Sequence, residues 1–486
     1  MPQNLPHMSE IRSAVEREIK LAVDAAFRLP SLKGRRLPTK ILTNMYFDTP
    51  DLRLARSRIT LRHRKEGRQA RWQLKLPLDC GRRELEIPGR ASPPAVFSDA
   101  LFIHLQGEEV GPVATLRTRR TGVRVGGSKQ GADVVLDDVA VLKGTSEVVK
   151  FREVEIEQLD SNVAIDNDLE LLLRQAGASD HDGRPKLFRA LDLPSPTPPA
   201  APDPQASDEA HLSYMLTRQL DALLMHDPGM RVGGEIEDVH QMRVATRRMR
   251  SILRVARPLV DPEWAEPLRT RLDWLGRRLG DARDLDVQIT YFHSQVDGLP
   301  PKDRPALEEF VDYLRTKRAR VQRALVRDLR RSRYVRLINQ LTLDVRTPHC
   351  IRTEITLRKL AGKAFRKFCQ SVKHLDETAS SAQWHGVRIR AKRARYAAEL
   401  SALRVGPRAT EFIERIKVIQ DHLGDVQDAV IAEKLLRRFT SKATSPRYTF
   451  LAGQLAERQH RRQREAKHAF LTMWKAFKKA GQQVWS

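Results

Sequence analysis

The chain has 486 residues, 30% of which are charged, and its formal net charge is +26 at pH 7. It is too long for one hydrophobic core, so two or three domains are expected, and a hydrophobic content of 41% is enough to fold them. Residues 1–200 carry 32 Lys and Arg against 27 Asp and Glu, whereas residues 201–486 carry 55 against 34. The C-terminal part is therefore expected to meet a polyanion or an anionic surface.

The cysteines and the hydropathy indicate the compartment. Cys80, Cys350 and Cys369 form no CxxC pair, so reduced thiols are expected, not a disulfide framework or a zinc site. The N-terminus has no apolar run of the signal-peptide type, and the chain has no stretch of about 18 apolar residues. These features predict a soluble, cytoplasmic protein without a membrane partner.

A proline-rich stretch divides the chain. Residues 193–208 contain six prolines, which predicts a stiff, extended linker. Before it, apolar and polar residues alternate with period two, as expected for antiparallel hairpins. After it, Leu, Ala, Val and Arg recur at helical spacing. The predicted architecture is α+β and multidomain, with a β domain at 10–192, the linker at 193–208 and an all-α domain at 209–482.

Charged side chains share one face on most of the predicted strands. The sets are Glu16, Glu18 and Lys20; Arg62 and Arg64; Gln73 and Lys75; Glu84 and Glu86; Arg117 and Arg119; and Glu153, Glu155 and Glu157. A solvated outer face explains any single strand equally well, but it would mix charges in any order. In a barrel closed with this face inward, the carboxylates can hold divalent cations and the basic groups can hold phosphate oxygens. Hydrolysis of a triphosphate needs that arrangement.

In their order along the chain, these residues resemble the CYTH domain of the triphosphate tunnel metalloenzymes, over roughly residues 10–190. Glu16-x-Glu18-x-Lys20 matches the ExExK signature, residues 45–52 resemble the YFDTPDL segment, and Lys186-x-x-Arg189 ends the set. The resemblance implies an eight-stranded antiparallel β-barrel tunnel in which water attacks a terminal phosphoryl group. No residue suggests itself as a covalent nucleophile.

The CYTH resemblance also implies roles for single residues. It implies Mg²⁺ or Mn²⁺ bound by Glu16, Glu18, Glu153 and Glu155, with Asp137 either a further ligand or a structural acid. The predicted catalytic residues are Glu16, Glu18, Lys20, Glu153 and Glu155. The predicted phosphate-binding residues are Lys20, Arg62, Arg64, Lys75, Arg117, Arg119, Lys186 and Arg189. The run from Arg117 to Arg120 permits two strand registers, so which of its arginines lines the tunnel stays open.

The all-α part repeats itself. A histidine followed by basic residues at +3, +7, +8 and +10 occurs at His240 and again at His385, and Leu279–Asp284 recurs as Leu423–Asp428. Repeats at about 209–345 and 350–482 predict two similar bundles with twofold pseudo-symmetry. Offsets 0, +3, +7 and +10 fall within an arc of about 80° on a helix. The resulting stripes contain no acid over three turns, whereas a solvated face normally mixes signs, so they predict an anion site. Arg254, at +14, extends the first stripe, whereas Glu399 stands at the equivalent position of the second.

These motifs resemble the CHAD domain over roughly residues 209–480. The resemblance implies two four-helix bundles facing across a basic channel that binds inorganic polyphosphate. The predicted binding residues are His240, Arg243, Arg247, Arg248, Arg250, His385, Arg388, Lys392, Arg393 and Arg395. Asp284 and Asp428 are expected to orient arginines.

The two resemblances together predict metal-dependent hydrolysis of inorganic triphosphate in the barrel and polyphosphate binding by the helices, in the cytoplasm and at polyphosphate granules. Hydrolysis of thiamine or nucleoside triphosphates, or adenylate cyclisation, stays open; each needs a pocket for an organic group, which Tyr46, Phe47 and Trp72 could line. A non-catalytic granule binder is a further alternative. Nucleic-acid binding ranks last, because no aromatic stacking platform accompanies the charge. The sequence fixes neither the metal, the chain length of the substrate nor the oligomeric state.

Overall fold

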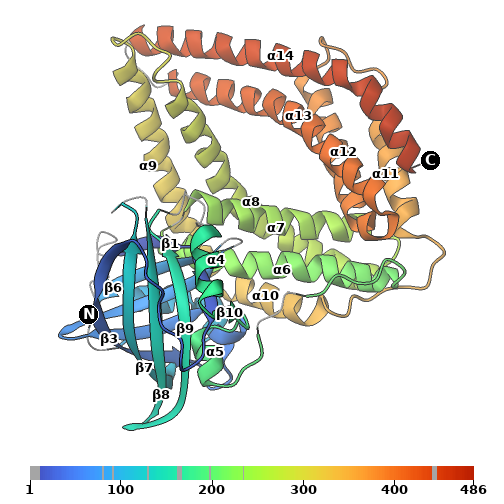
Figure 1. The fold of residues 1–486 in the computed structure, drawn as a ribbon. Coiled ribbons are helices and arrows are strands. Elements are labelled where there is room, and N and C mark those ends of the chain that lie inside the picture. Colours follow the sequence, from blue (N-terminus) through green and yellow to red (C-terminus); the bar gives the residue numbers. More distant parts are fainter. Residues whose placement is uncertain are drawn as a thin grey trace. The chain divides into compact units, whose positions relative to one another are not determined.

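The structure, a computed structural model, describes residues 11–78, 81–89, 92–127, 131–160, 167–195, 199–233, 235–440 and 446–485. It contains two compact units, Met1–Pro198 with Met225–Gly234, and Pro199–Leu224 with Glu235–Ser486 (Figure 1). Of the predicted linker, residues 196–198 lie outside the described part, and residues 199–207 form neither helix nor strand. Cys350 and Cys369 are free thiols, as expected; Cys80 lies outside the described residues.

The first unit is built on one antiparallel sheet. Its described strands are β1 (Arg12–Glu16), β2 (Glu18–Ala22), β3 (Gly34–Asp48), β4 (Thr60–Glu66), β5 (Gln69–Pro77), β6 (Arg82–Pro88), β7 (Gly111–Val125), β8 (Ala132–Lys143), β9 (Ser146–Gln158) and β10 (Ser179–Asp180). They lie in the order β1-β6-β5-β4-β3-β7-β8-β9-β2-β10. The antiparallel expectation is therefore confirmed.

The sheet has ten strands in the described residues, not the predicted eight, and its ladder does not close into a barrel. The N-terminal segment is interrupted at Arg17, so that β1 pairs with β6 while β2 pairs with β9. The short β10 adds a further strand beside β2. β1 and β2 are thus joined by the peptide chain at Arg17 and not by a ladder of hydrogen bonds.

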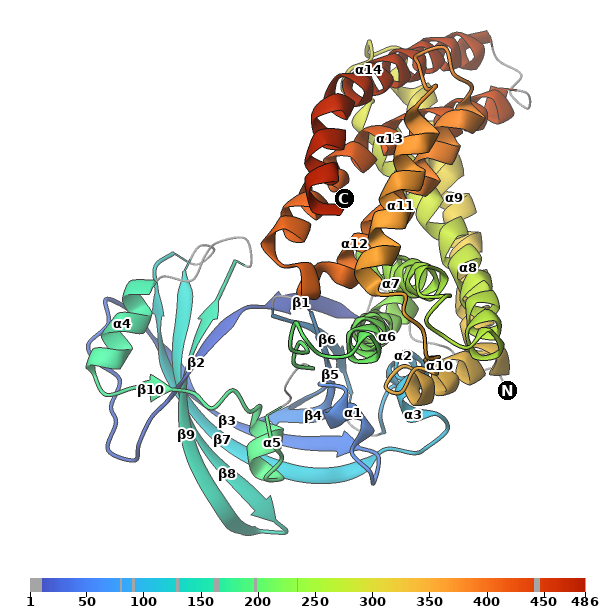
Figure 2. The ribbon, with the colours of Figure 1, turned by 90° about the vertical axis from the view of Figure 1, so that its right-hand side faces the viewer.

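Helices cover the apolar face of this sheet (Figure 2). They are α1 (Arg53–Arg56), α2 (Ala95–Ala100), α3 (Phe102–Leu105) and α4 (Asn167–Gln175). A further helix, α5 (Lys186–Ala190), lies on the opposite face of the sheet, where Leu187 packs with Leu116 and Tyr46. Leu74 and Leu85 pack with Phe97 of α2, and Ile156 packs with Leu173 of α4. Since successive residues of a strand point to opposite faces, burying these apolar residues turns the charged residues between them to the other face.

The second unit is helical, as predicted. Its helices are α6 (Asp208–Val232), α7 (Ile236–Val255), α8 (Pro262–Ser294), α9 (Arg304–Leu329), α10 (Ser332–Asp344), α11 (Leu357–Val372), α12 (Ser381–Val405), α13 (Pro407–Thr440) and α14 (Pro446–Trp485), of which the last turns of α6 count with the first unit. Local signals fix their starts. Asp261 caps α8 with Pro262 in its first turn, and Ser380 and Gln383 form a capping box on α12.

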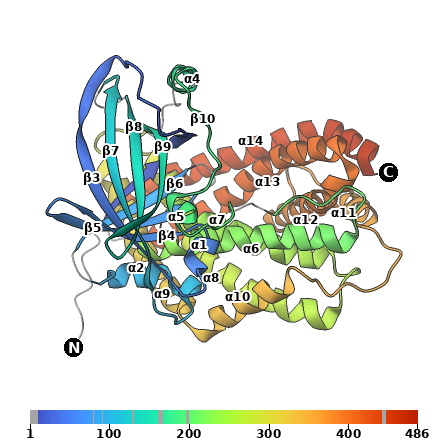
Figure 3. The same ribbon diagram turned by 60° about the horizontal axis from the view of Figure 1, so that its bottom comes forward.

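The helices of the two repeats share a core instead of forming two separate bundles. Leu285 and Phe310 of the first repeat pack in one cluster with Leu436 and Leu455 of the second, and α13 runs beside α14 (Figure 3). The second repeat adds a cluster of its own between α11 and α14. In the described part of the chain, no helix combines the length and the apolar composition needed to span a membrane.

Candidate functional site

The charged faces of the strands line a cavity of about 510 Å³ in the first unit. Eight of the predicted site residues line it: Glu16, Glu18, Lys20, Arg62, Arg64, Lys75, Glu155 and Lys186. Five further charged or titratable residues that were not predicted line it too: Arg82, Arg120, Glu157, His181 and Arg184. The cavity therefore combines carboxylates with an excess of basic groups.

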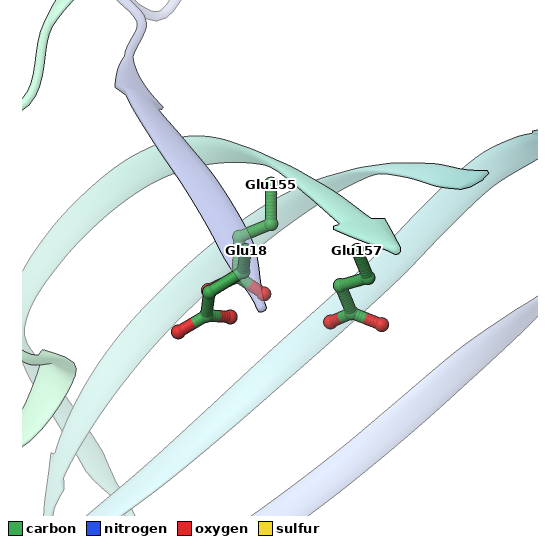
Figure 4. Close-up of side chains that lie close together, drawn as sticks. All are labelled: Glu18, Glu155 and Glu157. Carbon is green, nitrogen blue, oxygen red and sulfur yellow. The ribbon is translucent and has the colours of Figure 1, made fainter. Parts of the chain in front are cut away.

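Three carboxylates converge on one side of this cavity. Glu18 projects from β2, and Glu155 and Glu157 project from β9 (Figure 4); oxygen atoms of the three lie within 4.8 Å of one another. The pairing of β2 with β9 places Glu18 opposite Glu157, which explains the convergence. Burial, together with the negative charges of Glu155 and Glu18, raises the pKa of Glu157 to about 7.

Arg120 and Lys186 bind these carboxylates from the neighbouring elements. Arg120 lies 2.6 Å from both Glu155 and Glu157 and 2.7 Å from Asp137. Lys186 Nζ lies 2.6 Å from Asp137 and 3.1 Å from Glu155. Burial alone would raise the pKa of Glu155, but Lys186, Lys20 and Arg120 hold it well below its ordinary value.

Asp137 and Glu153 are fully buried and engaged by cations. Both oxygens of Asp137 accept hydrogen bonds from Arg120. Glu153 lies 3.0 Å from Lys186 and 3.2 Å from Arg189, and His181 Nε2 lies 3.4 Å from it. Neither carboxylate belongs to the converging group of Glu18, Glu155 and Glu157, so each is placed to fix the basic side chains around the cavity.

Glu16 belongs to a different wall. Its carboxylate lies 2.5 Å from Lys75 Nζ, which also lies 3.2 Å from Glu84. Burial and the neighbouring Glu84 raise the pKa of Glu16. Burial would also raise the pKa of Glu84, but Lys75 and a hydrogen bond with Glu16 help to lower it to about 2. Because β1 pairs with β6, the two glutamates of the ExExK motif diverge: Glu16 faces β6, and Glu18 faces β9.

Two arginines of β4 lie between these walls. Arg62 donates to Gln73 Oε1 at 2.7 Å, and Arg64 donates to Asn44 Oδ1 at 2.9 Å. No carboxylate of the described residues lies within ion-pair distance of Arg64, and burial lowers its pKa to about 10. Gly81 lies beside them with φ +91°, and a Cβ atom there would come within 2.4 Å of the Glu16 carbonyl oxygen. The turn before β6 therefore needs glycine to approach the site.

The structure corrects the prediction for β7. Arg120 lines the cavity, whereas Arg117 and Arg119 have side chains that are 48% and 61% exposed. Arg117 pairs with Glu147, and Arg119 lies 3.8 Å from Asp138. The reason is register, because buried Leu116 and Thr118 share their face with Arg120. Arg117 and Arg119 are thus turned away from the cavity.

The acidic group suits a divalent cation. Three carboxylates supply oxygen ligands of the kind that Mg²⁺ and Mn²⁺ prefer, and their oxygen atoms lie within 4.8 Å of one another. Glu18, Glu155 and Glu157 would hold the ion. Of the predicted metal ligands, the structure brings Glu18 and Glu155 into this group and leaves Glu16, Asp137 and Glu153 outside it.

In the second unit, the two predicted stripes meet where α7 and α12 pack together. Burial and the positive charges of Arg388, Arg247 and Arg243 lower the pKa of Lys392 to about 7. The same neighbours, Arg247 and Arg243, act with burial to lower the pKa of Arg388. We call Arg243, Arg247, Arg388 and Lys392 the central group; it joins two residues from each repeat.

The repeated Leu-Gly-Asp motifs support the central group in matching ways. Arg243 lies 2.6 Å from Asp284, and Arg388 lies 4.0 Å from Asp428. Gly280 and Gly424 lie directly against these two guanidinium groups. In contrast, no carboxylate of the described residues lies within 4 Å of Arg247 or Lys392, although the Arg247 Nε atom is buried. The acids thus pair with one basic residue of each repeat in the central group and leave the other without a carboxylate partner among the described residues.

The remaining predicted residues lie around the central group. Burial and nearby arginines lower the pKa of His240, and His385 Nδ1 lies 2.9 Å from Gln427. Arg250 pairs with Asp273 at 2.5 Å, whereas Arg248 and Arg395 both lie near Glu399. Arg393 has no carboxylate within ion-pair distance among the described residues, and burial together with the charges of Arg254 and Arg390 lowers its pKa.

Signals in the sequence could have found some of the missed residues. Glu157 continues the i, i+2 alternation of Glu153 and Glu155, and Arg120 was the alternative register of its run. Nothing in the sequence singles out Arg82, which is half-buried and on which the charges of Glu18 and Glu16 act. His181 and Arg184 likewise stand in a loop without periodicity.

Two family models match the chain, the CYTH domain over residues 14–183 and the CHAD domain over residues 214–437. Two uncharacterized proteins of Mycobacterium tuberculosis, MT2285 of strain CDC 1551 and Rv2226 of strain H37Rv, are each 31% identical over 494 aligned residues. The alignments cover 92% of this chain and 93% of each relative.

Solved structures resemble the chain more distantly. PptA from Streptomyces chartreusis is 19% identical, with a TM-score of 0.46 over 55% of this chain and 98% of its own. The CHAD domain from the plant Ricinus communis is 22% identical, with a TM-score of 0.47 over 58% and 94%. The family models and the mycobacterial relatives show that this chain belongs to a family of proteins that carry a CYTH domain followed by a CHAD domain.

Proposed function

We propose that the first unit hydrolyses inorganic triphosphate with the help of Mg²⁺ or Mn²⁺, and that the second unit binds inorganic polyphosphate. The observation that supports hydrolysis most strongly is the cavity in which Glu18, Glu155 and Glu157 converge beside buried basic side chains. A site that only bound anions would gain nothing from carboxylates facing them. A non-catalytic granule binder is therefore the weaker alternative.

The residues divide the work in this proposal. Lys75, Arg62 and Arg64 bind phosphate oxygens, and Arg120 and Lys186 hold the acidic group in position. A divalent cation bound by Glu18, Glu155 and Glu157 would neutralise phosphoryl oxygens and orient the attacking water. The water oxygen forms a bond to the terminal phosphorus while the bridging P–O bond breaks. Orthophosphate and pyrophosphate leave, and one proton is released.

The lining of the cavity favours an inorganic substrate over an organic triphosphate. Tyr46 and His181 are the aromatic side chains among the described lining residues. Tyr46 is buried beside Arg62, and His181 lies against Glu153. Trp72 packs on the apolar side against Phe47 and His63. A nucleobase or a thiamine ring would therefore find no aromatic face to stack on.

The central group supports polyphosphate binding by the second unit. Burial and the repulsion of Arg388, Arg247 and Arg243 lower the pKa of Lys392 to about 7. A bound polyanion would relieve that repulsion. A chain that binds polyphosphate in this way would collect at polyphosphate granules.

A substrate panel tests the proposal. The purified chain is supplied with Mg²⁺ or Mn²⁺ and offered tripolyphosphate, long polyphosphate, ATP and thiamine triphosphate, while phosphate release is measured. Tripolyphosphate is expected to be the preferred substrate. Glu18→Gln should abolish release, whereas Glu147→Gln, at the far end of β9 from the acidic group, should not. Preference for ATP with pyrophosphate as product would contradict the proposal.

A further inference from the structure

The two repeats carry opposite charges at one position of the helix pair. A shift of 145 residues takes His240 onto His385, Arg248 onto Arg393 and Arg254 onto Glu399. The same shift relates the members of the central group, since it takes Arg243 onto Arg388 and Arg247 onto Lys392. The pair formed by Arg248 and Glu399 therefore corresponds to the pair formed by Arg393 and Arg254. The first pair has opposite charges, whereas the second has two positive charges.

Glu399 of α12 lies near two arginines, Arg248 across the contact with α7 and Arg395 one turn earlier on α12 itself. Its two carboxylate oxygens lie 3.8 Å from Arg248 Nε and 3.3 Å from Arg395 Nε. The side chains of Glu399 and Arg395 are each only 14% exposed. We call Arg248 and Arg395 the closed pair, because a phosphate oxygen could bind either one only in competition with a carboxylate that is already in place.

Arg254 and Arg393 have no such carboxylate. Glu266, the acid that acts on Arg254 from nearby, pairs with Arg257 at 3.4 Å and with Arg269. No carboxylate of the described residues lies within ion-pair distance of Arg254 or Arg393, and burial together with Arg254 lowers the pKa of Arg393. We call these two residues the open pair; neither forms an ion pair among the described residues, and the positive charge of Arg254 acts on Arg393.

We propose that Glu399 makes the paired stripes directional, so that a polyphosphate chain on the central group extends over the open pair and not over the closed pair. This inference rests on the proposed function of the second unit. It assigns Glu399 as a specificity-determining residue that sets where the bound polyanion leaves the central group. It also assigns Arg254 and Arg393 as an additional phosphate subsite.

Two pairs of variants test the inference in the full-length chain, through equilibrium binding of end-labelled long polyphosphate over a range of salt concentrations. Glu399→Gln frees the closed pair, and affinity should rise about threefold or more with a steeper salt dependence. Its control is Glu411→Gln, which makes the same charge change and frees Arg415 on α13. The control should change affinity less.

The second pair acts on the open side. Arg254→Glu should pair with Arg393 and lower affinity about tenfold, whereas Arg257→Glu, at a side chain that is 65% exposed and paired with Glu266, should lower it less. Because Arg254 is exposed, this variant tests the inference even if Glu399→Gln does not fold, which thermal melting followed by circular dichroism would reveal.

The outcomes separate the two levels of the argument. No polyphosphate binding by the wild-type chain would overturn the proposed function of the second unit and this inference with it. Wild-type binding with Glu399→Gln equal to Glu411→Gln, or with Arg254→Glu equal to Arg257→Glu, would overturn the directional role alone.

Discussion

Arg120 offers a sharp test of the register of β7, because its neighbour Arg119 serves as a control on the same strand. Arg120→Gln removes the cation that lies within 2.7 Å of Asp137, Glu155 and Glu157. Asp137 is fully buried and Glu155 is 2% exposed. Removing one partner of a buried ion pair costs about 3–5 kcal/mol, so the free energy of opening of this part of the sheet should fall by an amount in that range.

Arg119→Gln removes the same kind of side chain from the exposed face. Its contact with Asp138 is 3.8 Å long and its side chain is 61% exposed, so the cost should stay below about 1 kcal/mol. The assay is hydrogen exchange of the β8 and β9 amides in the metal-free protein, which reports opening of this sheet separately from the helical unit. Equal effects of the two variants, or a larger effect of Arg119→Gln, would refute the assigned register.

Three further predictions concern binding and turnover. Since the pKa of Lys392 is lowered to about 7, its side chain is mostly neutral at pH 8. Polyphosphate favours the charged form of Lys392, so its binding should be coupled to the uptake of a proton. The affinity should therefore fall as the pH rises from 7 to 9. Calorimetry in buffers of different ionisation enthalpy should detect the proton uptake in the wild type and not in Lys392→Arg. The double variant Arg243→Glu with Arg247→Glu should weaken polyphosphate binding in a salt-dependent way, and unchanged affinity would remove these residues from the site. Glu18→Gln should leave polyphosphate affinity unchanged while it abolishes phosphate release, and a joint loss would contradict separate sites.

The sequence predicted the fold class because both periodicities are local. Alternation gave the antiparallel strands, helical spacing gave the second unit, and the repeated His-Arg stripes gave the helices that meet at the central group. The number of strands was wrong because the interruption at Arg17 depends on which strands the two halves pair with, β6 and β9. No local pattern carries that information. The shared core of the repeats, where Phe310 meets Leu436, was missed because periodicity identifies buried faces and not their partners.

The site shows the same limit at the level of single residues. Alternation identified Glu18, Glu155, Arg62 and Lys75 as members of one charged face, and all four line the cavity. It could not choose between the registers of Arg117-Thr-Arg119-Arg120, because arginine occupies both faces of that strand. The buried neighbours Leu116 and Thr118 decide the register. Similarly, the ExExK motif does not reveal that Glu16 and Glu18 face different strands.

The most direct test of the central claim is the fate of the oxygen atom of the attacking water. The wild-type chain is incubated with tripolyphosphate and Mn²⁺ in ¹⁸O-enriched water, the metal is removed, and the products are resolved by ³¹P nuclear magnetic resonance. Attack on the terminal phosphorus predicts one ¹⁸O atom in each orthophosphate and none in pyrophosphate. Absence of products, or label in the pyrophosphate, would contradict the proposal that this cavity hydrolyses the terminal phosphoanhydride.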